Sequence, residues 1–207
     1  MAPGPVEELI PSQRILLGPG PSDVAPRVLR AMSTPILGYL DPEFIRIMDG
    51  VAEMLREVFG TDDAFTLPIS GTGSAGMEAA LANLLEPGDV AVVVENGYFG
   101  LRLSEIASRQ GAEVVTVPVE WGHTASPEAV EAELKKHSDV KLLAAVHAET
   151  STGVLQPLND LAKLAHDNDA LFVADTVTSL GGSPINFDDI DIDFAYSATQ
   201  KCLGSPP

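Results

Sequence analysis

Two residues that each follow a short apolar run have side chains that suit one another chemically. Asp175 comes directly after the run 171–174. A carboxylate at the end of a buried strand is costly unless a partner compensates it, although alone it could simply accept structural hydrogen bonds. Lys201 follows the run 192–196 and a short polar stretch. Most lysines are exposed, but one that is partly withdrawn from water can act as a nucleophile and form an imine with an aldehyde.

A glycine-rich segment, residues 70–76, precedes a stretch of helical composition, and its glycines at 71, 73 and 76 would let a ligand approach the backbone. Free N–H groups at the start of a helix bind phosphate. Phe99 could offer a flat surface for stacking, or it could be a core aromatic. A phosphate loop, a strand-end carboxylate and a strand-end lysine together predict a site for pyridoxal 5′-phosphate, which needs each of these groups.

The same glycines also match the pattern Gly-x-Gly-x-x-Gly, with Glu95 at the end of the next apolar run. This pattern is typical of a nicotinamide-binding Rossmann domain. Two features speak against it. The strand expected before the glycines, residues 64–69, contains Pro68, which cannot join a central ladder, and Asp175 and Lys201 would have no role. The Rossmann domain and a non-catalytic remnant that binds partners remain alternatives.

The elements that must position these residues follow from hydrophobic patterning. Five apolar runs alternate with helix-like stretches, and runs without alternation suit strands that are buried on both faces. The runs are 90–94, 114–117, 142–146, 171–174 and 192–196, and the helices are 26–32, 42–59, 77–85, 101–110, 127–137 and 158–168. This order predicts an α/β fold, a three-layer α/β/α sandwich with a mainly parallel sheet, whose ligands bind at the carboxyl ends of the strands.

Composition excludes several classes of protein. The 207 residues hold 12 Lys and Arg against 30 Asp and Glu, a net charge of −18, which argues against nucleic-acid partners and against docking on an anionic membrane. Cys202 is the single cysteine, so an internal disulfide and a cysteine-based zinc site are excluded, and we expect no metal. With no signal-like or membrane-spanning stretch, a cytoplasmic location is predicted. Residues 1–21, rich in Pro and Gly, are expected to form an N-terminal arm before a domain over 22–207.

Seven motifs, in order along the chain, resemble those of the class V, fold-type I aminotransferases, in particular the alanine–glyoxylate and serine–pyruvate aminotransferase group. They are LGPGPS (17–22), GYLDPEF (38–44), SGTG (70–73), EPGD (86–89), ETSTGVLQP (149–157), ADTVTSLGG (174–182) and SATQK (197–201). The resemblance implies the large domain of a pyridoxal-phosphate transferase of fold type I. It also implies that only its first part is present, because the family continues after the lysine into a small C-terminal domain.

Carried over position by position, the resemblance implies one catalytic residue and a set of residues that bind pyridoxal 5′-phosphate. These are Lys201, which forms an imine with the cofactor; Asp175, which pairs with its pyridinium nitrogen; Thr72, Gly73, Ser74 and Gln200, which hold its phosphate; Thr150, near its phenolic oxygen; and Phe99, which stacks on its ring. Phe99 stands where close relatives often have Trp, and Ser74 and Tyr39 stand where His is frequent, which leaves the substrate preference open.

The activity that the resemblance implies is transamination between a small amino acid, alanine or serine, and a 2-oxo acid, glyoxylate or pyruvate. The complete enzyme is expected to be a homodimer. The missing part of the family's chain carries the arginine that binds the substrate carboxylate, so the 207-residue chain alone is expected to be inactive. A lyase or desulfurase that uses the same cofactor is the nearest alternative.

Overall fold

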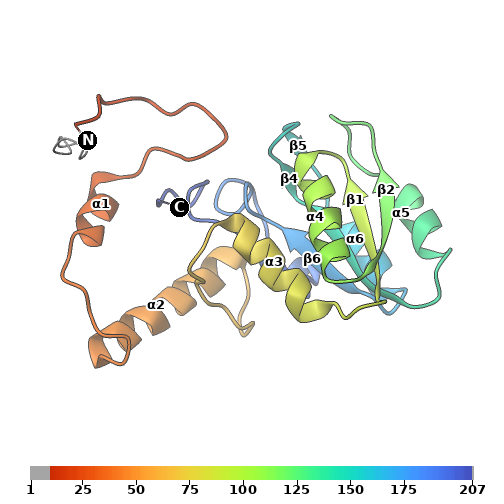
Figure 1. Ribbon diagram of the computed structural model, residues 1–207, viewed down its shortest axis with the longest axis horizontal. Helices are drawn as coiled ribbons and strands as arrows, with labels where there is room; N and C mark the ends of the chain where they lie inside the picture. Colours follow the sequence, from red (N-terminus) through yellow and green to blue (C-terminus); the bar gives the residue numbers. More distant parts are fainter. Residues whose placement is uncertain (1–9, 207) are drawn as a thin grey trace, which may run out of the picture.

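The five apolar runs form one parallel sheet in the computed structural model, which describes residues 10–206 (Figure 1). The strands are β1 (Val90–Glu95), β2 (Glu113–Pro118), β3 (Val140–Val146), β6 (Leu171–Asp175) and β7 (Phe194–Tyr196), in the order β2-β1-β3-β6-β7. All four neighbouring pairs are parallel. The register aligns Val146 with Asp175 and Asp175 with Tyr196, so the carboxyl ends of β3, β6 and β7 lie side by side.

Helices cover both faces of this sheet (Figure 1). On one face lie α3 (Gly73–Leu84) and α4 (Tyr98–Arg109), and on the other α5 (Pro127–Leu134) and α6 (Asn159–His166). Successive strand residues point to opposite faces. Val92 therefore packs with the α5 and α6 side and Val93 with the α3 and α4 side, both without solvent exposure. The predicted three-layer sandwich with a parallel sheet is confirmed, and burial on both faces explains why the strands have continuous apolar sequences.

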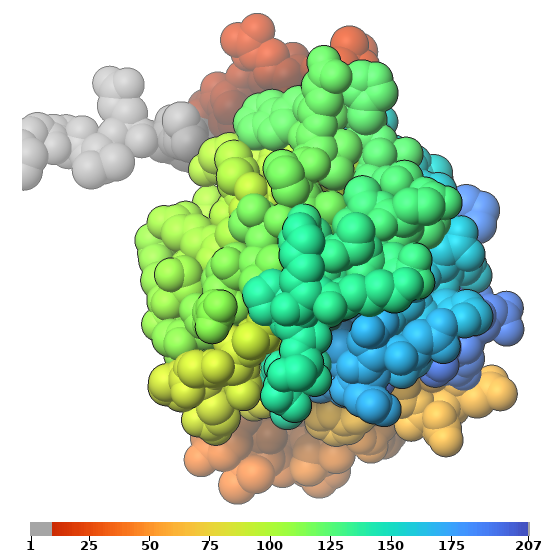
Figure 2. All heavy atoms as spheres, turned by 90° about the vertical axis from the view of Figure 1, so that its right-hand side faces the viewer, coloured from red at the N-terminus to blue at the C-terminus, as the bar shows by residue number. Residues whose placement is uncertain are grey.

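The first part of the described chain lies outside these layers. Residues 10–25 contain no helix or strand, and α1 (Pro26–Met32) and α2 (Pro42–Phe59) extend away from the sheet (Figure 1). Viewed from the right-hand side of Figure 1, residues of the sandwich fill the centre, with α2 in orange at the lower margin (Figure 2). Residues 1–9 of the predicted arm lie outside the described residues, and the division at residue 21 remains a prediction. None of the described helices has the length and apolar character needed to cross a membrane.

Local sequence explains the bounds of α2. Pro42 occupies its first turn, and the Asp41 side chain accepts a hydrogen bond from the N–H of Glu43 at 2.8 Å. Gly60 ends the helix in the left-handed conformation, with φ 71°, which glycine adopts without steric cost. These caps fix both predicted ends of the helix, residues 42 and 59.

The strand expected at residues 64–69 is absent. This segment is extended but has no assigned strand, and Phe65 is 87% exposed. Pro68 removes one donor, and none of the described strands pairs with the segment. The Thr66 hydroxyl donates instead to the Ala52 carbonyl in α2 at 2.7 Å. Without a partner strand, the β propensity of the segment is not sufficient to form a ladder.

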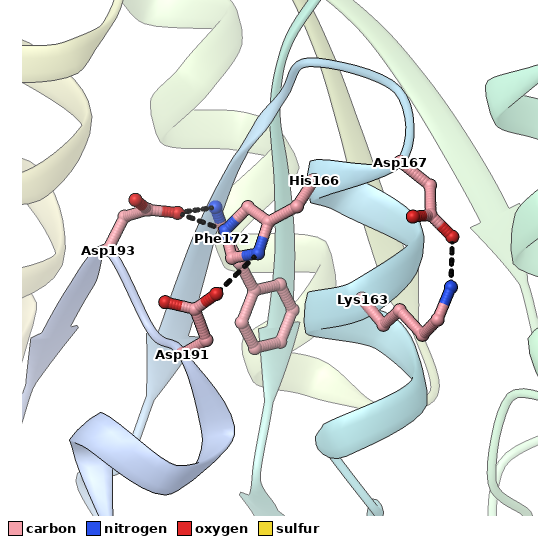
Figure 3. Close-up of polar contacts among 6 residues, drawn as sticks. All are labelled: Lys163, His166, Asp167, Phe172, Asp191 and Asp193. Atoms are coloured by element: carbon pink, nitrogen blue, oxygen red, sulfur yellow. Dashed lines mark hydrogen bonds and ion pairs between the residues drawn. The ribbon is translucent and has the colours of Figure 1, made fainter.

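A cluster of polar contacts joins α6 to the sheet at the amino ends of the strands (Figure 3). His166 Nε2 lies 2.8 Å from Asp193 Oδ2, and His166 Nδ1 lies 3.2 Å from Asp191 Oδ2. Asp193 Oδ2 also accepts a hydrogen bond from the N–H of Phe172, at 2.7 Å. Asp193 therefore connects α6, the start of β6 and the start of β7, at the edge of the sheet opposite to the carboxyl ends.

We expect Asp193→Ala to lower the free energy of unfolding by about 1–3 kcal/mol, because the N–H of buried Phe172 loses its acceptor. Asp191→Asn is the control, because Asp191 has a left-handed backbone conformation, with φ 63°, which asparagine also adopts. The Asp191 side chain is 85% exposed, against 34% for Asp193, so we expect a change within about 0.5 kcal/mol. Urea denaturation of the two variants measures the difference, and equal losses would contradict the role given to Asp193.

Candidate active site

A cavity at the carboxyl ends of the strands is lined by all eight of the residues predicted from the sequence. They are Thr72, Gly73 and Ser74 at the start of α3, Phe99 in the first turn of α4, Thr150 after β4 (Ala148–Glu149), Asp175 at the end of β6, and Gln200 and Lys201 after β7. The cavity holds about 510 Å³ of space, part of it open to solvent.

Asp175 is the buried charge of this cavity. It is 3% exposed, its Oδ1 accepts from the N–H of Val177 at 2.9 Å, and its Oδ2 accepts from the Tyr196 hydroxyl at 2.9 Å. Burial raises the pKa of Asp175 from 3.8 to about 6, and the charge of Glu149 adds to this, while the two hydrogen bonds and Lys201 act in the opposite direction. Such a carboxylate gains stability when a cation comes to lie beside it.

Tyr196 is a site residue that sequence reasoning missed. Burial and the neighbouring Asp175 raise the pKa of its phenol well above 10, so the hydroxyl remains a hydrogen-bond donor to the carboxylate. The register aligns Tyr196 with Asp175 across β6 and β7. Only a correct alignment of these two strands, which the sequence does not specify, could have predicted the contact.

Lys201 is held by a backbone group from the far end of the chain. Its Nζ donates to the Pro19 carbonyl at 2.7 Å. The same N-terminal segment is fixed there by Ser22, whose hydroxyl donates to the Lys201 carbonyl at 2.9 Å and whose N–H donates to the Gln200 carbonyl at 3.0 Å. The segment that the sequence predicts to be an extended arm therefore contacts the predicted catalytic lysine.

The start of α3 presents an N-terminal helix turn to the cavity. Thr72 is its N-cap, and within the described residues the Thr72 side chain accepts no hydrogen bond from the first turn. The N–H groups and the positive end of the helix dipole there suit an anion. Two of the glycines also have a role in packing. A Cβ at Gly73 would lie 3.1 Å from Val177 and Ala198, and one at Gly76 would lie 3.2 Å from Tyr196, so both residues allow α3 to pack closely on the ends of β6 and β7.

Phe99 and Thr150 complete the walls. Phe99 is half-buried, and its ring meets that of Tyr98 edge to face, with centroids 5.4 Å apart. The Thr150 hydroxyl lies 2.5 Å from the hydroxyl of Thr178, a second cavity residue that the sequence did not reveal. In addition to the buried carboxylate, the cavity therefore offers an aromatic side chain and a pair of hydroxyl groups.

This combination fits pyridoxal 5′-phosphate, which needs an amine, a carboxylate, an anion-binding helix start and a flat apolar surface. It does not fit the nicotinamide alternative. In a Rossmann fingerprint the glycines directly follow a strand, whereas residues 61–72 of the described chain contain no strand. Residues 71–76 therefore match that fingerprint in sequence but not in structure.

Comparison with known proteins agrees with the geometry. The family model of class-V aminotransferases matches residues 16–206. The (S)-ureidoglycine–glyoxylate transaminase of Bacillus subtilis is 45% identical over 199 residues, and the alanine–glyoxylate aminotransferase of Rattus norvegicus is 46% identical over 195 residues. The crystal structure of an alanine–glyoxylate aminotransferase from Nostoc sp. superposes with a TM-score of 0.95 at 47% identity.

These alignments cover nearly all of the chain and about half of each relative. They include 96% and 94% of this chain but 48% and 47% of the two enzymes, and 98% of this chain but 54% of the Nostoc structure. The chain thus spans about half the length of the curated relatives that it matches. The match of fold and sequence confirms the resemblance inferred from the seven motifs: the chain belongs to the class-V aminotransferase family, in the alanine–glyoxylate aminotransferase group.

Proposed function

We propose that the cavity binds pyridoxal 5′-phosphate and that Lys201 is the residue to which the cofactor becomes attached. Class-V aminotransferases depend on this cofactor, and the observation that carries the proposal is the convergence of all eight predicted residues on one cavity. In this proposal Thr72, Gly73 and Ser74 bind the phosphate through the helix start. Gln200 assists them from the loop after β7.

The remaining cavity residues orient the ring. Phe99 stacks on its face, Thr150 donates to its phenolic oxygen, and Asp175 pairs with its protonated nitrogen. Tyr196 supports this pairing, because its hydroxyl donates a hydrogen bond to Asp175 Oδ2 at 2.9 Å. The raised pKa of Tyr196 keeps its phenol neutral, so the negative charge stays on Asp175. When bound, the cofactor supplies an electron sink that stabilises negative charge at the substrate α-carbon.

Lys201 has a second task in this proposal. Its Nζ accepts the proton from the substrate α-carbon and returns it to the product, as a general base and acid. The amine must first exchange its hydrogen bond with the Pro19 carbonyl, at 2.7 Å, for contacts inside the cavity. The half-buried setting of Lys201 limits competition from water during this transfer.

For the whole protein we propose transamination between a small amino acid and a 2-oxo acid, with glyoxylate as the first acceptor to test. The similarity to a ureidoglycine–glyoxylate transaminase and to alanine–glyoxylate aminotransferases supports this proposal. The amino donor is the open part of the proposal, because Ser74 and Tyr39 differ from the residues frequent in the family.

A donor panel tests this activity. Full-length protein is incubated with excess cofactor, glyoxylate and one of alanine, serine or ureidoglycine, and glycine is measured over many turnovers. We expect glycine to form with at least one donor and not without donor. Absence of glycine with all three, from protein that retains cofactor, would contradict the proposed activity. Inactivity of the 207-residue chain alone and a cytoplasmic location remain predictions.

We also propose that the full-length protein is a homodimer. Exposed apolar side chains support an association surface in this part of the chain: those of α2, among them Ile45, Ile47 and Met54, and that of Phe65. Light scattering on the full-length protein is expected to give twice the monomer mass.

A further inference from the structure

Glu149 is a buried carboxylate that lies outside the cavity and has no role in the proposed reaction. It ends β4, is 1% exposed, and points at the start of α4. Its Oε2 accepts from the N–H of Phe99 at 3.0 Å and from the N–H of Gly100 at 3.3 Å. Its Oε1 accepts from the N–H of Ser151 at 3.0 Å and from the Ser151 hydroxyl at 2.7 Å. All four hydrogen bonds end on one charged group, which is the strong kind of contact.

The first turn of α4 depends on this contact because its own N-cap residue has no side chain. Gly97 is the N-cap, and a Cβ at this position would lie 2.3 Å from Glu149 Cγ and 2.7 Å from Ser151 Oγ. The lack of a side chain at Gly97 therefore leaves room for the carboxylate. Ser151 Oγ accepts from the N–H of Tyr98 at 2.9 Å. Three successive N–H groups at the start of α4 are thus bound by Glu149 and Ser151, where a negative charge also meets the positive end of the helix dipole.

We propose that Glu149 is a positioning residue that fixes the first turn of α4 so that the Phe99 ring forms the stacking wall of the cavity. The inference rests on the proposed function, since it assumes that the cofactor ring stacks on Phe99. The connection is short, because the N–H that Glu149 binds belongs to Phe99 itself. Thr150, the residue after Glu149, lines the same cavity. Glu149 therefore lies beside one cavity residue in sequence and is hydrogen-bonded to another, Phe99.

The charge of Glu149 and its positioning of Phe99 are expected to affect cofactor binding in opposite directions, so the two effects can be told apart. Its charge contributes to the raised pKa of Asp175. Removing that charge would make Asp175 easier to ionise and so would strengthen its pairing with a protonated ring nitrogen. A weaker affinity for cofactor after neutralisation of Glu149 therefore reports lost positioning and not lost charge.

The test is a double-mutant cycle on the full chain with pyridoxal 5′-phosphate as the probe. The variants are Glu149→Gln, Phe99→Ala and the double variant, with Glu105→Gln as control, because Glu105 is an α4 carboxylate that is 58% exposed and pairs with Arg109. The dissociation constant is measured by absorbance titration. Amide hydrogen exchange of residues 97–101 is followed without cofactor, and urea denaturation reports global stability.

We expect Glu149→Gln to weaken cofactor binding about tenfold in the wild-type background and less than about twofold in the Phe99→Ala background, because coupled residues are not additive. Exchange in residues 97–101 should accelerate, and Glu105→Gln should change neither quantity. If the wild type binds cofactor and Glu149→Gln binds it equally well, or loses the same factor without Phe99, the inference is overturned. If the wild type binds no cofactor, the proposed function itself has failed. Unchanged amide exchange of residues 97–101 in Glu149→Gln would overturn the capping role of Glu149.

Discussion

Lys201→Ala in the full-length protein is expected to lower the transamination rate by roughly a thousandfold or more, because both covalent attachment and proton transfer at the substrate α-carbon depend on this amine. The cofactor should still bind, with reduced affinity, since the helix start at Thr72, the Phe99 ring and Asp175 remain. The measurement is a coupled rate assay together with an absorbance titration of cofactor.

Lys163→Ala is the matched control for this change. Lys163 lies on the exposed face of α6, where it pairs with Asp167 (Figure 3), and its loss should leave the rate unchanged. A Lys201→Ala variant that sustains turnover near the wild-type rate would show that another group carries the proton.

Asp175→Asn is expected to have opposite effects on function and on stability. A neutral amide cannot keep the ring nitrogen protonated, so turnover should fall by about a hundredfold or more, in line with the cost of breaking a buried charge pair. The fold should survive, because the amide oxygen can accept from Val177 and the amide N–H₂ can donate to the Tyr196 hydroxyl. An unchanged rate would reduce Asp175 to a structural role.

The stability effect of the same variant depends on pH. The folded-state pKa of Asp175 is about 6, raised from 3.8, so between these values the folded chain keeps a proton that the unfolded chain loses. Wild-type stability therefore falls as the pH rises through this window, and the loss is complete above the folded pKa. We expect cofactor-free Asp175→Asn to be more stable than wild type at pH 8 by about 1–3 kcal/mol and equal to it near pH 4. Denaturation at the two pH values measures this, and a difference that does not change with pH would contradict it.

The layers of the fold could be predicted from sequence because burial on both faces leaves a signal in each strand. Val92 and Val93 face opposite helices and are both apolar, so the whole run stands out. The site could be found because Asp175 and Lys201 follow such runs, and the carboxyl ends of parallel strands meet at one edge. The family motifs then added Gln200 and Thr150, which no pattern of hydrophobicity distinguishes.

What the sequence did not reveal depends on contacts between distant parts of the chain. The Pro19 carbonyl that accepts a hydrogen bond from Lys201 is a backbone group 182 positions away. Because every residue has a backbone carbonyl, the type of residue does not indicate which one is the acceptor. Tyr196 looks like any buried aromatic until β6 and β7 are aligned. The strand predicted at 64–69 has local β character, but strand formation requires a partner, and none of the described strands provides one.

The most direct test of the central claim, that Lys201 is the cofactor lysine of this cavity, is borohydride reduction of the protein after incubation with pyridoxal 5′-phosphate, followed by peptide mapping by mass spectrometry. The chain has five lysines, at positions 135, 136, 141, 163 and 201, so the modified site can be assigned without ambiguity. We predict that the reduced cofactor is found on Lys201. A stoichiometric label on any other lysine, or no label on protein saturated with cofactor, would contradict the claim.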